Sequence, residues 1–146
     1  MSWISTNVKR ALLAGEIDFD AHTFRVALLM TNTSLAAAGQ EDVATVAGFT
    51  TLDESNGANY ARQTLAGLAV TADNPNNRAL FDANDSVYVT LGQGTRNLAG
   101  ALLFRFVTND ADSVPVAWFD AAPFPFAANG LDLTLRWNAV GIIALT

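Results

Sequence analysis

The sequence predicts an all-β fold, an antiparallel β-sandwich of the jelly-roll type that begins with one short helix. One observation predicts the fold class, and two more set the number of domains and the size of the core. Apolar residues gather in about seven or eight strand-length segments, separated by turns rich in Gly, Asn, Asp and Pro. No fixed-period repeat or linker interrupts the 146 residues, so we expect one domain over residues 1–146. A chain of this length buries roughly 68–70% of its unfolded surface, which is enough for a stable core without disulfides or metals.

A short amphipathic helix is expected over residues 5–14, "STNVKRALLA". Ser5 or Thr6 is suited to cap its start, because a hydroxyl accepts a hydrogen bond from a free backbone N–H. Gly15 stands where helices commonly end in a left-handed residue. The apolar residues expected on the buried face of the helix are Val8, Leu12 and Leu13.

Two segments predict the centre of a sheet. Residues 23–30 alternate, with Phe24 and Val26 on the same side, and predict a strand with one strongly apolar face. Residues 98–108 are the most apolar run, and apolar residues on both faces are typical of a central strand. A short helix is expected near residues 42–47. Further strands are expected at residues 59–73 (bent at Gly67), 78–82, 86–91, 114–120, 131–137 and 141–146.

Between the helix and the first strand, Glu16, Asp18 and Asp20 lie beside His22, the only histidine. One interpretation is a metal or catalytic cluster. The other is a turn, since Asp and His side chains readily bond nearby backbone groups. The acids alternate with apolar residues, and no second histidine is present to complete a metal site. The turn is therefore favoured, and we expect no enzymatic activity, no catalytic residue, no metal and no cofactor.

Composition indicates which partners the protein has. The formal net charge of −6 argues against nucleic acid, whose binding depends on clustered Lys and Arg. No run approaches the roughly 18 apolar residues of a membrane span, so we expect no membrane partner. Charged residues make up 15% of the chain, against about 25% in ordinary soluble domains. A chain so poor in charge is expected to be covered by other protein, as in an assembly subunit.

Residues 119–130, "FDAAPFPFAANG", combine three phenylalanines and two prolines with a single charge. Proline is expected to keep Phe124 and Phe126 out of a central ladder, which predicts a rigid, extended loop. This loop either covers one end of the core or serves as a hydrophobic anchor, because exposed apolar patches mark contacts. Together with the N-terminal segment, the predicted interface residues are Trp3, Ile4, Phe119, Pro123, Phe124, Pro125 and Phe126.

Two stretches resemble small virion structural proteins of tailed phages: residues 8–29, "VKRALLAGEIDFDAHTFRVALL", and residues 115–145, "PVAWFDAAPFPFAANGLDLTLRWNAVGIIAL". The middle of the chain matches this group only in its β-rich, turn-punctuated style, and "APFPF" departs from the usual polar turn. The residues that carry the resemblance are Leu12, Leu13, Gly15, Ile17, Asp18, Thr23, Phe24, Val26, Ala27, Leu28, Ala117, Phe119, Asp120, Leu133, Leu135, Trp137, Gly141 and Ile142.

The resemblance implies a non-enzymatic, multi-copy role, because proteins of this group include head decoration and cement proteins. We expect a capsid cement protein, made in the host cytoplasm and placed on the exterior of the virion. Its expected partners are the major capsid protein and itself, as a homo-oligomeric trimer or dimer. A tail component, either an adaptor or a receptor-binding module, is the alternative. A small hydrolase or lectin-like domain that uses acid pairs is a third possibility.

Overall fold

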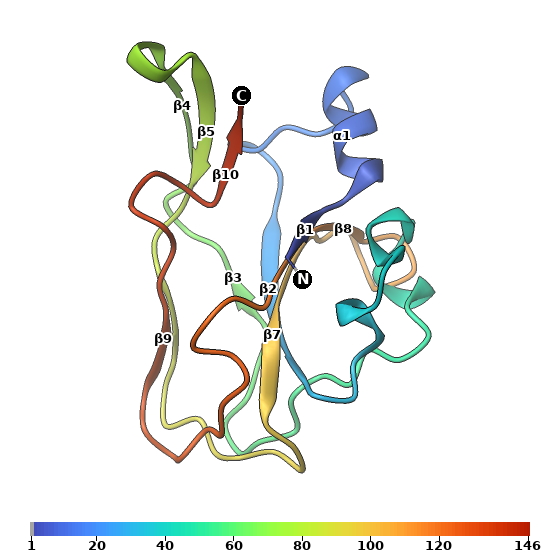
Figure 1. The fold of residues 1–146 in the computed structure, drawn as a ribbon, viewed down its shortest axis with the longest axis vertical. Helices are drawn as coiled ribbons and strands as arrows, with labels where there is room; N and C mark the ends of the chain where they lie inside the picture. The colour runs from blue at the N-terminus through green and yellow to red at the C-terminus, as the bar shows by residue number, and fades with distance from the viewer. Residues whose placement is uncertain (1) are drawn as a thin grey trace.

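The computed structural model describes residues 2–146, and in that range one α-helix accompanies ten strands in three antiparallel sheets (Figure 1). The predictions of an all-β fold and of a short N-terminal helix are confirmed. The largest sheet has five strands in the order β1-β8-β7-β2-β3. Its strands are β1 (Trp3–Ile4), β8 (Val114–Phe119), β7 (Leu98–Arg105), β2 (Phe24–Met30) and β3 (Gln63–Thr64).

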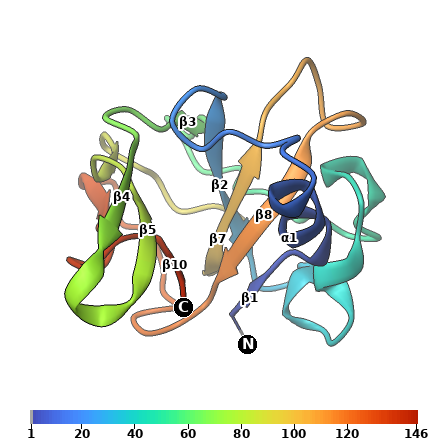
Figure 2. The same cartoon turned by 90° about the horizontal axis from the view of Figure 1, so that it is seen from above.

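Two smaller sheets lie on one side of the five-stranded sheet (Figure 2). A three-stranded sheet has the order β10-β5-β4, and a two-stranded sheet pairs β6 with β9. A short 3-10 turn, Asn74–Asn76, connects β4 to β5. The strands are β4 (Ala69–Asp73), β5 (Arg78–Asp82), β6 (Ser86–Tyr88), β9 (Leu133–Leu135) and β10 (Ile143–Leu145).

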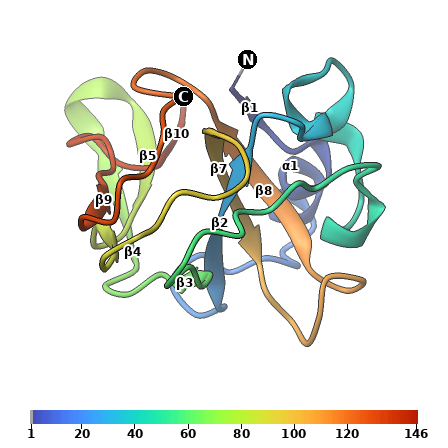
Figure 3. The same cartoon turned by 90° about the horizontal axis from the view of Figure 1, so that it is seen from below.

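The centre of the large sheet is buried on both faces. β7 lies between β8 and β2, as its apolar run predicts. β2 is also buried on both faces, so the prediction of a single apolar face is wrong. The cause is the segment at residues 34–49, which covers the second face and adds Leu35, Val46 and Phe49 to a core cluster with Trp118 (Figure 3). Two clusters therefore sandwich this sheet, one on each side.

Helix α1 (Thr6–Leu13) packs against β8 through Val8 and Ala11, which are buried. Leu13 is 93% exposed, so its predicted place on the buried face is wrong. Five residues beyond Val8, it lies about 140° around the helix from that residue. Ser5 occupies the N-cap position but its side chain makes no capping hydrogen bond, whereas Gly15 is left-handed as predicted, with φ 68°.

Two segments differ from their predicted form. The expected helix near residues 42–47 is replaced by separate 3-10 turns, Gln40–Asp42 and Val46–Gly48, with a third at Ser34–Ala36. The β-branched side chains of "VATV" disfavour a helix there. The expected strand over residues 59–73 divides into β3 and β4, because Gly67 turns the chain at φ 66°.

A partly buried ion network joins two loops beside the large sheet. The Arg62 guanidinium donates to Glu54 at 2.7 Å and to Asp110 at 2.8 Å. The hydroxyl of Tyr60 also donates to Glu54, at 2.6 Å. Hydrogen bonds and charge from Arg62 hold the pKa of the Asp110 carboxyl below its usual value.

We expect the free energy of unfolding to fall as pH drops below about 4, the pKa of Asp in an unfolded chain. The pKa of Asp110 is lowered in the folded state, so the unfolded chain takes up protons first. The stabilisation is complete above the unfolded pKa and is lost as pH falls through the folded one. Asp110→Asn should flatten this dependence in thermal unfolding between pH 6 and about 3. Asp42→Asn, which removes an equal charge at an exposed carboxylate outside this ion network, is the control and should not flatten the dependence as Asp110→Asn does.

Candidate interaction groove

The two N-terminal residues of the predicted interface pair with a strand of their own sheet. Trp3 and Ile4 form β1, which pairs with Trp118 and Ala117 of β8. The indole N–H of Trp3 donates to the carbonyl of Leu35 at 3.0 Å. The segment forms one edge of the large sheet. Both side chains are half-buried, so only part of each is available for a contact with another protein.

Four of the other predicted residues meet at one place. Phe119, Pro123, Phe124 and Phe126 line an open groove of about 710 Å³. Pro125 is exposed and does not line it. The groove thus unites most of the predicted loop residues, while Trp3 and Ile4 lie outside it.

The sequence does not predict the other residues that line the groove. This second wall consists of Leu133, Leu135, Trp137 and Ile142, on β9 and on the segment that leads to β10. The alternation of Leu133, Leu135 and Trp137 with polar residues predicts a strand, and an apolar strand face is ordinarily assigned to the core. The only further signal was the proximity of this strand to the "FPF" loop in the chain.

Ring contacts and hydrogen bonds fix both walls. Phe124 stacks on Phe126 with ring centroids 5.2 Å apart, and Phe119 meets Trp137 edge-on at 5.6 Å. The Trp137 backbone N–H donates to Asp85 at 3.0 Å. Aromatic pairs of this geometry contribute beyond their buried area, so the groove is preformed rather than dependent on its occupant.

The aromatic loop is also anchored to the large sheet. Phe126 and Leu98 exchange backbone hydrogen bonds of 3.1 and 2.8 Å at the start of β7. Phe126 thus forms one isolated bridge, and neither Phe124 nor Phe126 belongs to a strand, as predicted for this proline-rich loop: Pro125 lacks its own N–H, and the N–H of Phe126 donates only to Leu98. Phe124 and Phe126 pack on the core with one side and line the groove with the other, so the loop both covers the core and presents a surface.

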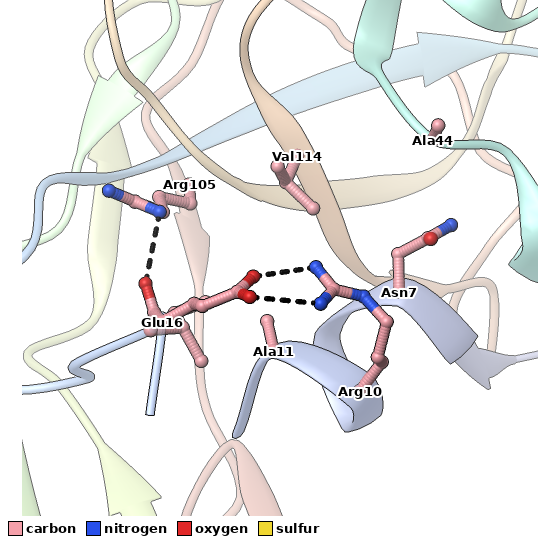
Figure 4. Close-up of a pocket in the computed structure, with 8 residues that line it drawn as sticks. Asn7, Arg10, Ala11, Glu16, Ala44, Arg105 and Val114 are labelled. Atoms are coloured by element: carbon pink, nitrogen blue, oxygen red, sulfur yellow. Dashed lines mark hydrogen bonds and ion pairs between the residues drawn. The ribbon is translucent and has the colours of Figure 1, made fainter. Parts of the chain in front are cut away.

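A second, smaller cavity of about 210 Å³ lies beside helix α1 (Figure 4). Arg10 donates to both carboxylate oxygens of Glu16, at 3.0 and 2.6 Å. Arg105 donates to the backbone carbonyl of Glu16 at 3.3 Å. The hydrogen bond from Arg10 lowers the pKa of the Glu16 carboxyl. The charged groups of this cavity are engaged with one another, which makes it a poorer candidate than the groove.

The acids beside His22 form the predicted turn. The N–H of Asp18 donates to Nδ1 of His22 at 3.0 Å, and the N–H of His22 donates back to the Asp18 carbonyl at 3.0 Å. The N–H of Asp20 donates to the Asp18 carboxylate at 3.2 Å. Over residues 2–146, no three His, Asp or Glu side chains gather as a metal would require.

The fold and the groove define a class: an all-β protein with a preformed, aromatic-lined apolar surface. No family model, curated protein or solved structure matches the chain. Within the described residues, none of the helices is both long and apolar enough to cross a membrane.

Proposed function

We propose that this protein is a virion structural protein, a capsid cement or decoration protein that binds across junctions of the major capsid protein. The observation that carries the proposal is the groove, in which half-buried aromatic rings line about 710 Å³ of open apolar space. Apolar surface of this kind on a soluble protein marks a contact site, and aromatic residues are enriched at the centres of interfaces. The low charge of the chain, 15%, agrees with a surface that is largely covered in an assembly.

Such a protein stabilises the capsid by mass action. It binds the mature lattice and not the loosened one, which lowers the free energy of the intact shell. A homo-oligomer, a trimer or dimer, places several groove contacts on the shell at once, and effective concentration adds their weak affinities. A symmetric oligomer of this kind also matches the symmetry points of the capsid exterior.

The proposal includes the finer architecture, a β-sandwich of the jelly-roll type. It is supported by one core cluster that takes Val26 and Leu103 from the large sheet and Phe81, Tyr88 and Ile143 from the smaller sheets. Two sheet layers thus share one interior, which is the packing that sandwiches use.

Replacing both Phe124 and Phe126 with Ser is expected to abolish assembly while the monomer stays folded. Both rings are partly buried and pack on the edge of the core with one side, so the monomer loses some stability but keeps its fully buried core, whereas the interface loses its aromatic anchors. Sedimentation with purified heads and sedimentation velocity of the free protein measure the two forms of assembly. Circular dichroism checks the fold.

Val87→Ser with Val89→Ser is the matched control, since these side chains are 44% and 60% exposed and do not line the groove. The control should bind heads as the wild type does. A folded Phe124/Phe126 double variant that still associates normally would exclude the groove as the assembly surface.

A further inference from the structure

The groove follows the unpaired edge of a strand. β9 pairs with β6 on one side, and no strand of residues 2–146 pairs with its other side. Because side chains alternate along a strand, a groove on one face is lined by every second residue. Here all three residues of β9, Leu133, Thr134 and Leu135, line it, and so do Arg136 and Trp137, which follow the strand. The groove therefore runs along the edge of β9, where a further strand can add to the sheet by backbone hydrogen bonds.

Among the described residues that line the groove, Arg136 alone is charged. It is exposed, and within the described part of the chain its guanidinium makes no ion pair, hydrogen bond or ring contact. Every other arginine contacts a carboxylate, a carbonyl, an imidazole or a phenylalanine ring. Arg136 therefore offers the groove one guanidinium whose hydrogen-bond donors are free to meet an occupant. A carboxylate is the group that complements a free guanidinium best.

The rest of the lining defines the remainder of the occupant. Phe124, Phe126 and Ile142 offer apolar surface on the walls, which matches apolar side chains at alternate positions of an added strand. A fatty acid also combines an apolar body with a carboxylate. Its acyl chain carries no series of backbone N–H and C=O groups to pair with an open strand edge, so the edge favours a peptide.

We propose that the groove binds an extended segment of a partner protein, added along the edge of β9, whose carboxylate pairs with Arg136 and whose apolar side chains pack on the aromatic loop. This inference rests on the proposed function, because it gives the chemistry of the partner segment at the same groove. Arg136 is then a specificity residue: the apolar walls hold any apolar strand, and the guanidinium selects an acidic one.

Selection of a random twelve-residue peptide library on the immobilised protein tests the proposal. The enriched peptides are expected to carry one Asp or Glu within alternating apolar residues. Their Kd, measured by fluorescence anisotropy, should rise about tenfold on Arg136→Gln, as for the loss of one charge-assisted pair. Replacing the peptide acid with its amide should cost the same, and the two changes together no more than either alone. Arg10→Gln removes an equal charge outside the groove and is the control, with unchanged Kd.

Three outcomes overturn the proposal. If the enriched peptides lack an acidic residue, or bind the Arg136→Gln variant as tightly as the wild type, the proposed pairing of a carboxylate with Arg136 is contradicted. Backbone amide NMR signals report where the peptide binds, and shifts confined to residues outside the groove would place it elsewhere. Dodecanoate that binds through Arg136 while no peptide is enriched assigns the groove to an acyl chain.

The result separates this inference from the proposed function, because peptide binding is measured on the isolated protein. Heads that take up the Arg136→Gln variant normally but not the Phe124/Phe126 double variant contradict the inference and leave the cement role standing. The opposite result is also distinguishable. If acidic peptides bind in a way that depends on Arg136, but this protein is absent from purified particles, the cement role is contradicted and the peptide site stands.

Discussion

Replacing Gly57 with Ala is expected to destabilise the fold by about 4 kcal/mol or more, a large share of the stability of a typical domain. A Cβ at this position lies 2.0 Å from the carbonyl oxygen of Gly92 and 2.9 Å from its carbonyl carbon. Both are backbone atoms, so no side chain can rotate away to make room. Gly57 is buried at the place where its segment crosses residues 90–95.

The effect extends toward the groove because the crossing supports the β6–β9 sheet. The N–H of Gly92 donates to Ala58 at 2.9 Å, and the neighbouring Leu91 N–H donates to Leu131 at 3.1 Å, just before β9. Moving the 90–95 segment to admit a methyl group strains both bonds. Loss of fold and loss of the groove are therefore expected together.

Thermal and urea unfolding measure the loss for Gly57→Ala. Gly48→Ala is the control, because its Cβ meets only side-chain atoms, the nearest at 3.0 Å on Val43, which can shift. The control should change the midpoint by at most a few degrees. A Gly57→Ala variant as stable as the wild type would show that the two segments do not cross in this way.

Trp118→Ala is expected to cost about 3–5 kcal/mol, the range for a large aromatic side chain removed from a core. Trp118 is fully buried on β8 and belongs to the cluster on the second face of the large sheet. Its ring occupies the space left by the missing side chain of Gly100, where a Cβ would lie 2.5 Å from the ring edge. The cavity left behind adds to the loss of buried apolar surface.

Urea denaturation with a constant m-value gives this loss of stability directly. Trp118→Phe keeps part of the ring volume and should lose distinctly less than Trp118→Ala. A loss below about 1 kcal/mol for the alanine variant would place Trp118 at the surface rather than in the second cluster.

Most of the strands and the N-terminal helix could be predicted because local patterns determine them, whereas the short strand β1 and the 3-10 turns at residues 40–48 could not. The apolar run of β7 predicts a central strand, and Gly15 ends α1 as its position indicates. Leu13 was misassigned because apolar character alone does not fix the position around a helix. The second buried face of β2 was missed because its cover comes from residues 34–49, which have no strand or helix pattern of their own.

Only one of the two groups of residues that line the groove could be predicted from the sequence. Unusual composition marks the loop that holds Phe124 and Phe126, so one wall of the groove is visible in the sequence. The other wall is an ordinary alternating strand, and nothing local shows that the free edge of β9 faces that loop. That Arg136 has no partner within residues 2–146 likewise depends on where the acids lie in the folded chain.

The copy number of this protein in purified virions, relative to the major capsid protein, tests the proposed cement role most directly. Quantitative mass spectrometry of intact particles and of separated heads and tails measures it. A copy number comparable to that of the shell protein, confined to heads, is the expected result. A small number that matches the symmetry of a tail and separates with tails would contradict the cement role in favour of a tail component. Absence from the particle would contradict any structural role in the virion.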